Sequence, residues 1–87
     1  MSFSIKYDKQ PQDFLRKSDK YIIKRIMDKI DELFTEATVP HNAKRVIGYE
    51  ETTFRVRIGD YRALYRVNYK ENKIIIVKLD PRKNVYD

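Results

Sequence analysis

One short segment, FRVRIGDYRALYRV at residues 54–67, constrains the fold of this chain more than any other part of it. On each side of Gly59 and Asp60, apolar and polar residues alternate with the period of a half-buried strand. Gly followed by Asp suits a type II′ turn, whose first central residue has a positive φ. The segment therefore predicts a β-hairpin with a two-residue turn, and such a turn fixes which residues face each other across the strands.

The predicted register sorts the side chains of the hairpin onto two faces of a sheet. Arg57 is expected opposite Arg62, and Ile58 opposite Tyr61, because cross-strand partners share a face. One face carries the apolar and aromatic set Phe54, Val56, Ile58, Tyr61, Ala63, Tyr65, Val67 and Tyr69. The other carries Arg55, Arg57, Arg62, Leu64, Arg66 and Asn68. We expect the first set to form core and the second to form a sheet face rich in guanidinium groups.

Periodicity also predicts one strand and two helices before the hairpin. Residues 3–7 alternate as a strand, and Pro11 suits the first turn of a short helix. Between Ser18 and about Glu36, apolar residues recur at helical spacing, which predicts an amphipathic helix with its apolar stripe in the core. The stripe consists of Ile23, Ile26, Met27, Ile30, Leu33 and Phe34.

Three strands are predicted in the second half of the chain, at residues 54–58, 61–69 and 73–79, after a connection at 37–53 that shows no sustained period. The last strand, KIIIVKL, has apolar residues at both odd-numbered and even-numbered positions, so we expect it in mid-sheet with both faces covered. The element order predicts an α+β fold: an N-terminal strand, a helical hairpin and a three-stranded antiparallel meander, with the helices packed on one face of the sheet. No repeat or linker interrupts the sequence, so residues 1–87 are expected to form a single domain.

Composition excludes several classes of protein. The chain contains no cysteine, which excludes disulfides and thiolate chemistry. No apolar run approaches the roughly 20 residues that a membrane span requires, and the N-terminal MSFSIKYDK is too polar for a signal peptide. We therefore expect a soluble cytoplasmic protein that makes no membrane contact. The sequence has no cluster of histidine and carboxylates at metal-ligand spacing and no glycine-rich phosphate loop, which disfavours metal-dependent hydrolysis.

The charge balance indicates an anionic partner but does not identify which kind. Nineteen Lys and Arg against thirteen Asp and Glu give a net charge of +6, which is compatible with nucleic acid, an acidic protein or anionic lipid. Directly opposed like charges are unfavourable, so the pair of Arg57 and Arg62 requires an explanation. Either the guanidinium groups spread into solvent or pair with Glu50 and Glu51, or they bind an anion. The planar donor fork of arginine matches a phosphate, so several arginines on one face suit a phosphodiester.

Taken together, these motifs resemble those of the RelE/ParE toxin superfamily of toxin–antitoxin systems. FRVRIGDYRALYRV is preceded by AKRVIG and followed, after one more strand, by DPRKNVYD, and the resemblance covers essentially the whole chain. It implies a RelE-type, ribosome-dependent endoribonuclease that cuts messenger RNA in the decoding site. The implied reaction is attack of the 2′-hydroxyl on the adjacent phosphorus, without a metal or any other cofactor. The implied partners are a cognate RelB-like antitoxin, the ribosome and messenger RNA.

The resemblance also implies roles for individual residues. It assigns phosphate contact and charge stabilisation to Arg57, Arg62 and Arg82 as catalytic residues. It gives the catalytic set a fourth member, Tyr86, which is expected to stack on a base or take part in proton transfer, or else to tie the tail to the sheet. The expected substrate-binding residues are Arg55, Arg66, Lys44, Arg45 and Lys83, and further contacts to ribosomal RNA are expected from Lys20, Lys24 and Arg25. Arginine is a poor proton acceptor, so the general base stays open, with Lys44, Lys78 and Lys83 as candidates.

Two other functions are compatible with the same residues. A ParE-like toxin with this fold would bind and inhibit DNA gyrase without catalysis of its own. A third possibility is a basic module that binds RNA or an acidic protein and cuts nothing. Fold alone does not separate these functions, because related folds carry different activities.

Overall fold

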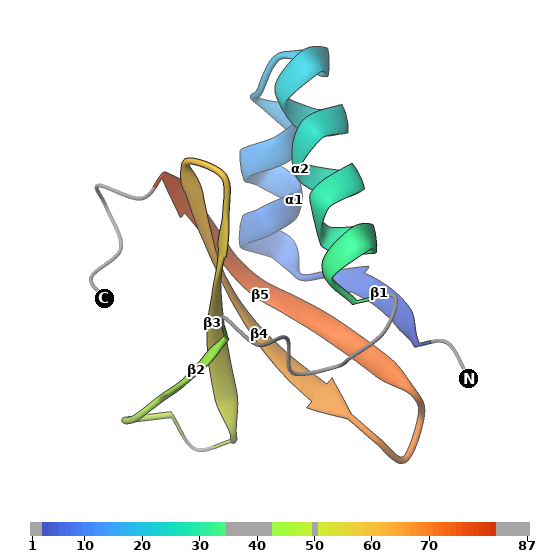
Figure 1. The fold of residues 1–87 in the computed structure, drawn as a ribbon, viewed down its shortest axis with the longest axis vertical. Helices are drawn as coiled ribbons and strands as arrows, with labels where there is room; N and C mark the ends of the chain where they lie inside the picture. Colours follow the sequence, from blue (N-terminus) through green and yellow to red (C-terminus); the bar gives the residue numbers. More distant parts are fainter. Residues whose placement is uncertain (1–2, 35–42, 50, 82–87) are drawn as a thin grey trace.

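A computed structural model describes residues 3–34, 43–49 and 51–81 of the chain. The elements are β1 (Ser4–Tyr7), α1 (Lys9–Arg16), α2 (Lys20–Leu33), β2 (Lys44–Val46), β3 (Thr53–Ile58), β4 (Tyr61–Asn68) and β5 (Lys73–Pro81). The strands form one five-stranded sheet in the order β1-β5-β4-β3-β2, in which β1 is parallel to β5 and the other pairs are antiparallel. The two helices form a hairpin against the sheet (Figure 1). The predicted α+β fold, with its helical hairpin and meander, is confirmed.

The core lies between the helices and one face of the sheet. Ile26 and Ile30 of α2 are 1% and 0% exposed, as the apolar stripe predicted. They belong to one buried cluster with Leu15 of α1 and with the apolar residues of β3, β4 and β5. Met27 is the exception in the stripe, because its side chain is 38% exposed.

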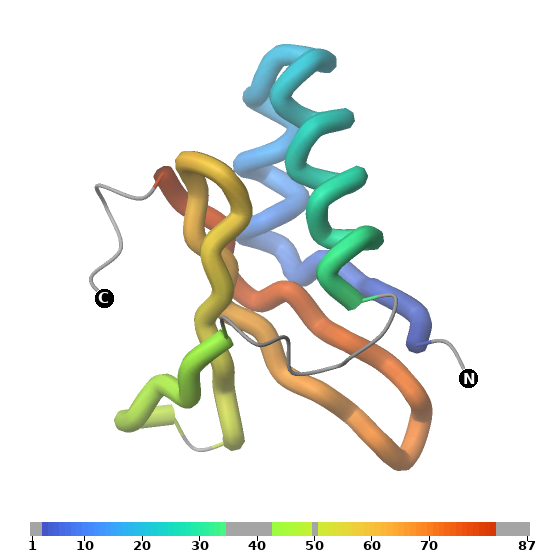
Figure 2. Tube along the Cα trace, in the orientation of Figure 1, coloured from blue at the N-terminus to red at the C-terminus, as the bar shows by residue number. Residues whose placement is uncertain are grey.

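The predicted hairpin is confirmed residue by residue. Arg57 pairs with Arg62 and Ile58 with Tyr61, and the chain turns sharply from β3 into β4 (Figure 2). Gly59 has a φ of +60°, whereas Asp60 does not have a positive φ, which is the pattern of a type II′ turn rather than type I′. The turn chemistry of two residues therefore fixes the register of both strands.

The aromatic residues of the hairpin differ from one another in burial. Tyr65 is fully buried, with its ring 4.8 Å from that of Phe34 and 5.6 Å from that of Phe54. The prediction that Tyr69 belongs to the core face is wrong. Tyr69 follows the end of β4, is 64% exposed and contacts Phe3 edge to face at 6.0 Å.

The prediction that β5 is an interior strand is confirmed, because it lies between β1 and β4, but the expectation that both of its faces are covered is wrong. Ile74, Ile76 and Leu79 are fully buried on the helix side, whereas Ile75 is half-buried and Lys78 is exposed on the other side. Leu79 lies on the same face as Ile74 and Ile76, although it has the opposite parity, because the register between β4 and β5 shifts at Leu64/Tyr65. Val77 is the extra residue, since Ile76 pairs with Tyr65 and Lys78 with Leu64.

One strand lies inside the segment that was predicted to be a connection. β2 pairs antiparallel with β3 at one edge of the sheet, with Lys44 opposite Arg55 and Val46 opposite Thr53. Three residues are too few to show a period of two. The sequence pattern therefore missed β2, and with it the edge of the sheet.

Candidate functional site

The face of the sheet that points away from the helices collects the predicted site residues of β2, β3 and β4. Pairing across the strands forms two rows on this face, and cross-strand partners share a face. The first row is Lys44, Arg55, Leu64 and Lys78, and the second is Arg57, Arg62 and Asp80. We call these seven residues, together with Arg66, the arginine face.

The turn brings Arg57 and Arg62 together as direct cross-strand partners. Arg57 is exposed and Arg62 is half-buried. Like charges opposite each other in an antiparallel pair destabilise a sheet by a few tenths of a kcal/mol up to about 1 kcal/mol. An anion between them would remove this repulsion, so the pair is suited to a phosphate.

Asp80 supplies negative charge at one end of the second row. Asp80 pairs with Arg62 across β4 and β5, and its side chain is only 20% exposed. One of its carboxylate oxygens lies 3.7 Å from the ammonium group of Lys78. The arginine face thus holds six cations and one acid, which leaves it strongly positive.

Arg66 is already engaged within the protein. Its Nε lies 3.5 Å from the hydroxyl of Thr53 and 3.4 Å from the carboxylate of Glu51. Thr53 is fully buried and donates a hydrogen bond of 3.0 Å to the Glu51 carbonyl. Of the two acids expected as alternative partners, Glu51 therefore does pair with an arginine of this face, while Glu50 lies outside the described residues.

Leu64 gives the arginine face an apolar centre. It is 6% exposed although it lies on the side away from the helices. Its cross-strand partners are Arg55 and Lys78, whose long aliphatic stems are suited to covering apolar surface while their charged ends stay in water. Positively charged side chains therefore flank the buried apolar side chain of Leu64 on this face.

Some predicted site residues do not join this face. Arg45 pairs with Phe54 and is exposed on the side of the sheet that carries the helices. Lys20, Lys24 and Arg25 belong to α2, which packs on the opposite layer. The predicted residues Arg82, Lys83 and Tyr86 lie outside the described part of the chain.

Comparison with known proteins identifies the family. The sequence model of one protein family, the ParE toxin of type II toxin-antitoxin systems, parDE, matches residues 5–86. The chain belongs to the RelE/ParE superfamily of type II toxins. No curated protein matches the toxin by sequence.

Solved structures share the fold of the toxin. A chain of the archaeal RelE-RelB complex from Pyrococcus horikoshii OT3 is 32% identical, with a TM-score of 0.75 over 98% of the toxin and 100% of that chain. A chain of the RelB-RelE antitoxin-toxin complex from Methanococcus jannaschii is 27% identical, with a TM-score of 0.65 over 94% and 95%. A chain of the RelBE2 toxin-antitoxin complex from Mycobacterium tuberculosis is 22% identical, with a TM-score of 0.77 over 94% and 100%, and this likeness concerns the fold alone.

Sequence reasoning missed two residues of the toxin that bear on the site. Asp80 was assigned to a tail after the last strand, but β5 continues through it to Pro81. Gln10 was not singled out, yet its side-chain amide bonds to the backbone of Leu79, next to Asp80. An acid at the end of an apolar strand was the one available signal for Asp80, and no local signal points to Gln10.

The described residues of the toxin contain neither a metal-binding cluster nor a membrane-spanning helix. Among residues 3–34, 43–49 and 51–81, no group of His and carboxylate side chains is arranged to hold a metal ion. No helix in the same ranges is long and apolar enough to cross a membrane.

Proposed function

We propose that this toxin is a ribosome-dependent endoribonuclease that cuts messenger RNA in the decoding site and thereby inhibits translation in the cytoplasm. The observation that supports it best is the pairing of Arg57 with Arg62 on a face that holds six cations. A half-buried arginine and an exposed one, fixed by a tight turn, form a preorganised positive site. Such a site is suited to the negative charge that develops on a reacting phosphate.

The proposed reaction transfers the phosphoryl group within the RNA strand. The 2′-oxygen forms a bond to the adjacent phosphorus, and the bond from phosphorus to the 5′-oxygen breaks. The proton of the 2′-hydroxyl passes to a base, and the leaving 5′-oxygen takes a proton from an acid. The products are a 2′,3′-cyclic phosphate and a 5′-hydroxyl, so neither an oxidant nor a metal enters the balance.

The arginine face suits the charge requirement of this reaction. Arg57 and Arg62 are proposed to contact the non-bridging phosphate oxygens as their negative charge grows, together with Arg82. Arg55 and Lys44 form the neighbouring pair and are proposed to hold the strand beside the scissile phosphate. Tyr86 is proposed to stack on a base or to take part in proton transfer.

The base of the reaction is proposed to be a lysine of this face or Lys83. An arginine does not lose its proton in a protein, which rules out the guanidinium groups. Lys44 and Lys78 stand at the two ends of the row that contains Leu64, and both are exposed. Replacing each of them with Met tests the assignment, because loss of the base should remove one limb of the pH–rate profile.

A second proposal concerns the protein partner. The matching chains from Pyrococcus horikoshii and Methanococcus jannaschii are parts of RelE-RelB complexes. We propose that a RelB-like antitoxin lays an amphipathic helix or an extended segment over this toxin, with acidic side chains toward its arginine face. The net charge of +6 favours an acidic partner.

The decisive test of the proposed activity in cells is the position of the cuts. Brief expression of the toxin, followed by mapping of the 5′ ends of cellular messages, should yield cuts in codon phase within translated regions. Cuts spread over untranslated RNA as well, or an absence of new ends, would oppose ribosome-dependent cleavage.

A different function has one observation in its favour, because the family model that matches is that of ParE toxins. A ParE-like activity would be inhibition of DNA gyrase without cleavage of RNA. A supercoiling assay with purified gyrase and toxin separates the two proposals. Loss of supercoiling together with intact message would select gyrase as the target.

A further inference from the structure

The C-terminal half of β5 has an open edge that β1 does not cover. β1 pairs with β5 only from Lys73 to Ile76. The last bond of this pairing is donated by the Asp8 N–H to the Ile76 carbonyl at 2.9 Å, and α1 begins at the next residue. Beyond Ile76, the backbone groups on this side of β5 require partners from outside the sheet.

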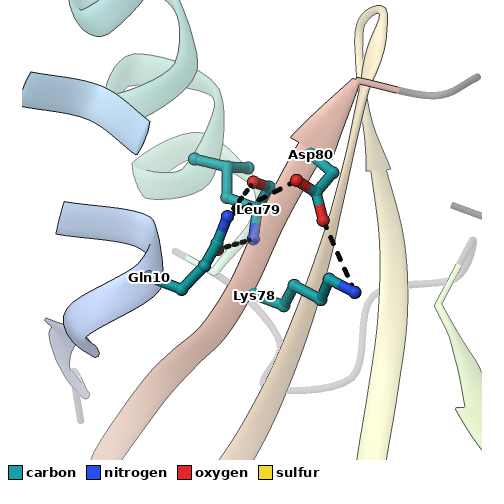
Figure 3. Close-up of polar contacts among 4 residues, drawn as sticks. All are labelled: Gln10, Lys78, Leu79 and Asp80. Carbon is teal, nitrogen blue, oxygen red and sulfur yellow. Dashed lines mark hydrogen bonds and ion pairs between the residues drawn. The ribbon is translucent and has the colours of Figure 1, made fainter. Parts of the chain in front are cut away.

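The side chain of Gln10 supplies those partners. Its Nε2 donates to the Leu79 carbonyl at 3.0 Å, and its Oε1 accepts from the Leu79 N–H at 2.8 Å (Figure 3). These are the two bonds that one residue of a neighbouring antiparallel strand would make to Leu79. The amide of Gln10 therefore covers the edge of β5 at Leu79, beyond the end of the pairing with β1.

The same amide reaches the row that contains the arginine pair. Gln10 Nε2 lies 3.4 Å from a carboxylate oxygen of Asp80, whose other oxygen faces Lys78 (Figure 3). Asp80 is the cross-strand partner of Arg62. Hydrogen bonds thus link α1 to Asp80 through Gln10, and strand pairing places Asp80 directly opposite Arg62.

We propose that Gln10 is a positioning residue for phosphate contact: it holds the end of β5 and the carboxylate of Asp80, and through them it orients Arg62. This inference rests on the proposed endoribonuclease function. Glutamine is suited to the task because its amide carries both a donor and an acceptor, whereas Glu lacks the donor and Met lacks both.

The test compares two identical substitutions on one helix. Gln10→Met removes the bonds to Leu79 and keeps the length and helix propensity of the side chain. Gln12→Met is the matched control, because Gln12 is an exposed residue of α1 whose Nε2 donates to the Tyr7 carbonyl at 2.6 Å, away from the end of β5. Two readouts are required: amide hydrogen exchange of Leu79 in the purified toxin, and kcat and KM for message cleavage on programmed ribosomes.

The expected result separates positioning from simple destabilisation. In Gln10→Met, the Leu79 amide should exchange faster and kcat should fall by about ten- to a hundredfold, since small displacements of a catalytic group have effects of this size. KM for ribosomes should stay within about twofold of that of the unmodified toxin, because the remaining cations still bind RNA. Gln12→Met should keep the unmodified kcat.

The inference is overturned if Gln10→Met keeps the unmodified kcat, or if Gln12→Met loses as much. Faster exchange at Leu79 without a change in kcat overturns it as well, since the bonds would then hold the strand without orienting Arg62. Failure of the proposed function is distinguishable, because in that case the unmodified toxin itself leaves the message intact.

Discussion

Arg62 and Asp80 are cross-strand partners on the arginine face, and they are partners only because β5 contains one extra residue. In a regular ladder that continues the pairing of Tyr65 with Ile76, Arg62 would oppose Leu79. The bulge at Val77 moves Leu79 to the core and Asp80 to the arginine face. A local irregularity in backbone pairing therefore decides which side chain stands beside a proposed catalytic arginine.

Asp80→Asn should have opposite effects on binding and cleavage. The substitution keeps the shape of the side chain and removes the single negative charge in the rows of the arginine face. Affinity for RNA should rise by a few-fold, because each phosphate meets a more positive surface. Cleavage on ribosomes should nevertheless fall by about tenfold, because Arg62 loses the carboxylate that is proposed to orient it.

The control for Asp80→Asn is Asp28→Asn, which changes the net charge equally on α2, where Asp28 pairs with Lys24 at 2.7 Å. Filter binding with a short single-stranded RNA and cleavage assays on both variants provide the comparison. Equal cleavage by both variants would show that Asp80 has no part in the site.

Gly59→Ala should destabilise the toxin by about 1–2 kcal/mol through backbone strain alone. Gly59 has a φ of +60°, and no atom lies within 4 Å of the position that an alanine Cβ would occupy. The cost therefore comes from the left-handed conformation and not from a clash. Urea denaturation measures it, with Asp60→Ala as the control in the same turn at a residue without positive φ. An unchanged midpoint for Gly59→Ala would contradict the type II′ turn.

Removing one arginine of the arginine face should weaken the salt dependence of RNA binding by a defined amount. Each phosphate contact that is lost lowers the slope of log affinity against log salt by about one, or somewhat less for single strands. Arg57→Gln should show this change, whereas Arg16→Gln on α1, which packs against the other face of the sheet, should not. Titration of labelled RNA at several KCl concentrations measures both slopes. Equal slopes for the two variants would mean that RNA does not distinguish the faces of the sheet.

The stability of the toxin should fall steeply in strong alkali because of the half-buried Tyr7 and the buried Tyr65. Burial and the nearby Asp31 raise the pKa of Tyr7 to about 12, above its ordinary value near 10. Burial likewise raises the pKa of Tyr65, which is fully buried in the core. The folded state therefore holds these protons more tightly than the unfolded state, and the resulting stability is complete below pH 10 and lost as the pH rises toward 12.

Thermal unfolding between pH 9 and 12 checks this expectation. The unmodified toxin should lose more of its Tm over this range than Tyr7→Phe, which carries no phenol at residue 7. Identical pH profiles of the two proteins would show that Tyr7 titrates alike in the folded and unfolded states.

Turn chemistry and periodicity were sufficient to predict most of the fold. The pairing of Arg57 with Arg62 follows from Gly59 and Asp60 alone, because the conformation of a two-residue turn is a local property. The stripe that contains Ile26 and Ile30 likewise repeats over enough turns of helix to identify its buried face. Both features could therefore be predicted from the sequence without tertiary information.

Features that depend on pairing between distant parts of the chain could not be predicted from the sequence. β2 is too short to show a period, and Val77 carries no local mark of a bulge, because the shift arises only when β5 aligns with β4. The contact of Gln10 with Leu79 spans 69 positions in the sequence. The arginines of the site were therefore predictable, whereas the acid and the amide that accompany them required the assembled sheet.

Cleavage on programmed ribosomes is the measurement that tests the proposed function most directly. Purified toxin should cut the message within the decoding site, and Arg62→Ala should reduce kcat by about a hundred- to a thousandfold, as expected for loss of a group that stabilises transition-state charge. Circular dichroism should show that this variant stays folded, and Lys29→Ala, which removes one charge from α2, should cut at the unmodified rate. Intact message in the presence of folded, unmodified toxin would contradict the proposed activity, and full cleavage by Arg62→Ala would contradict the site.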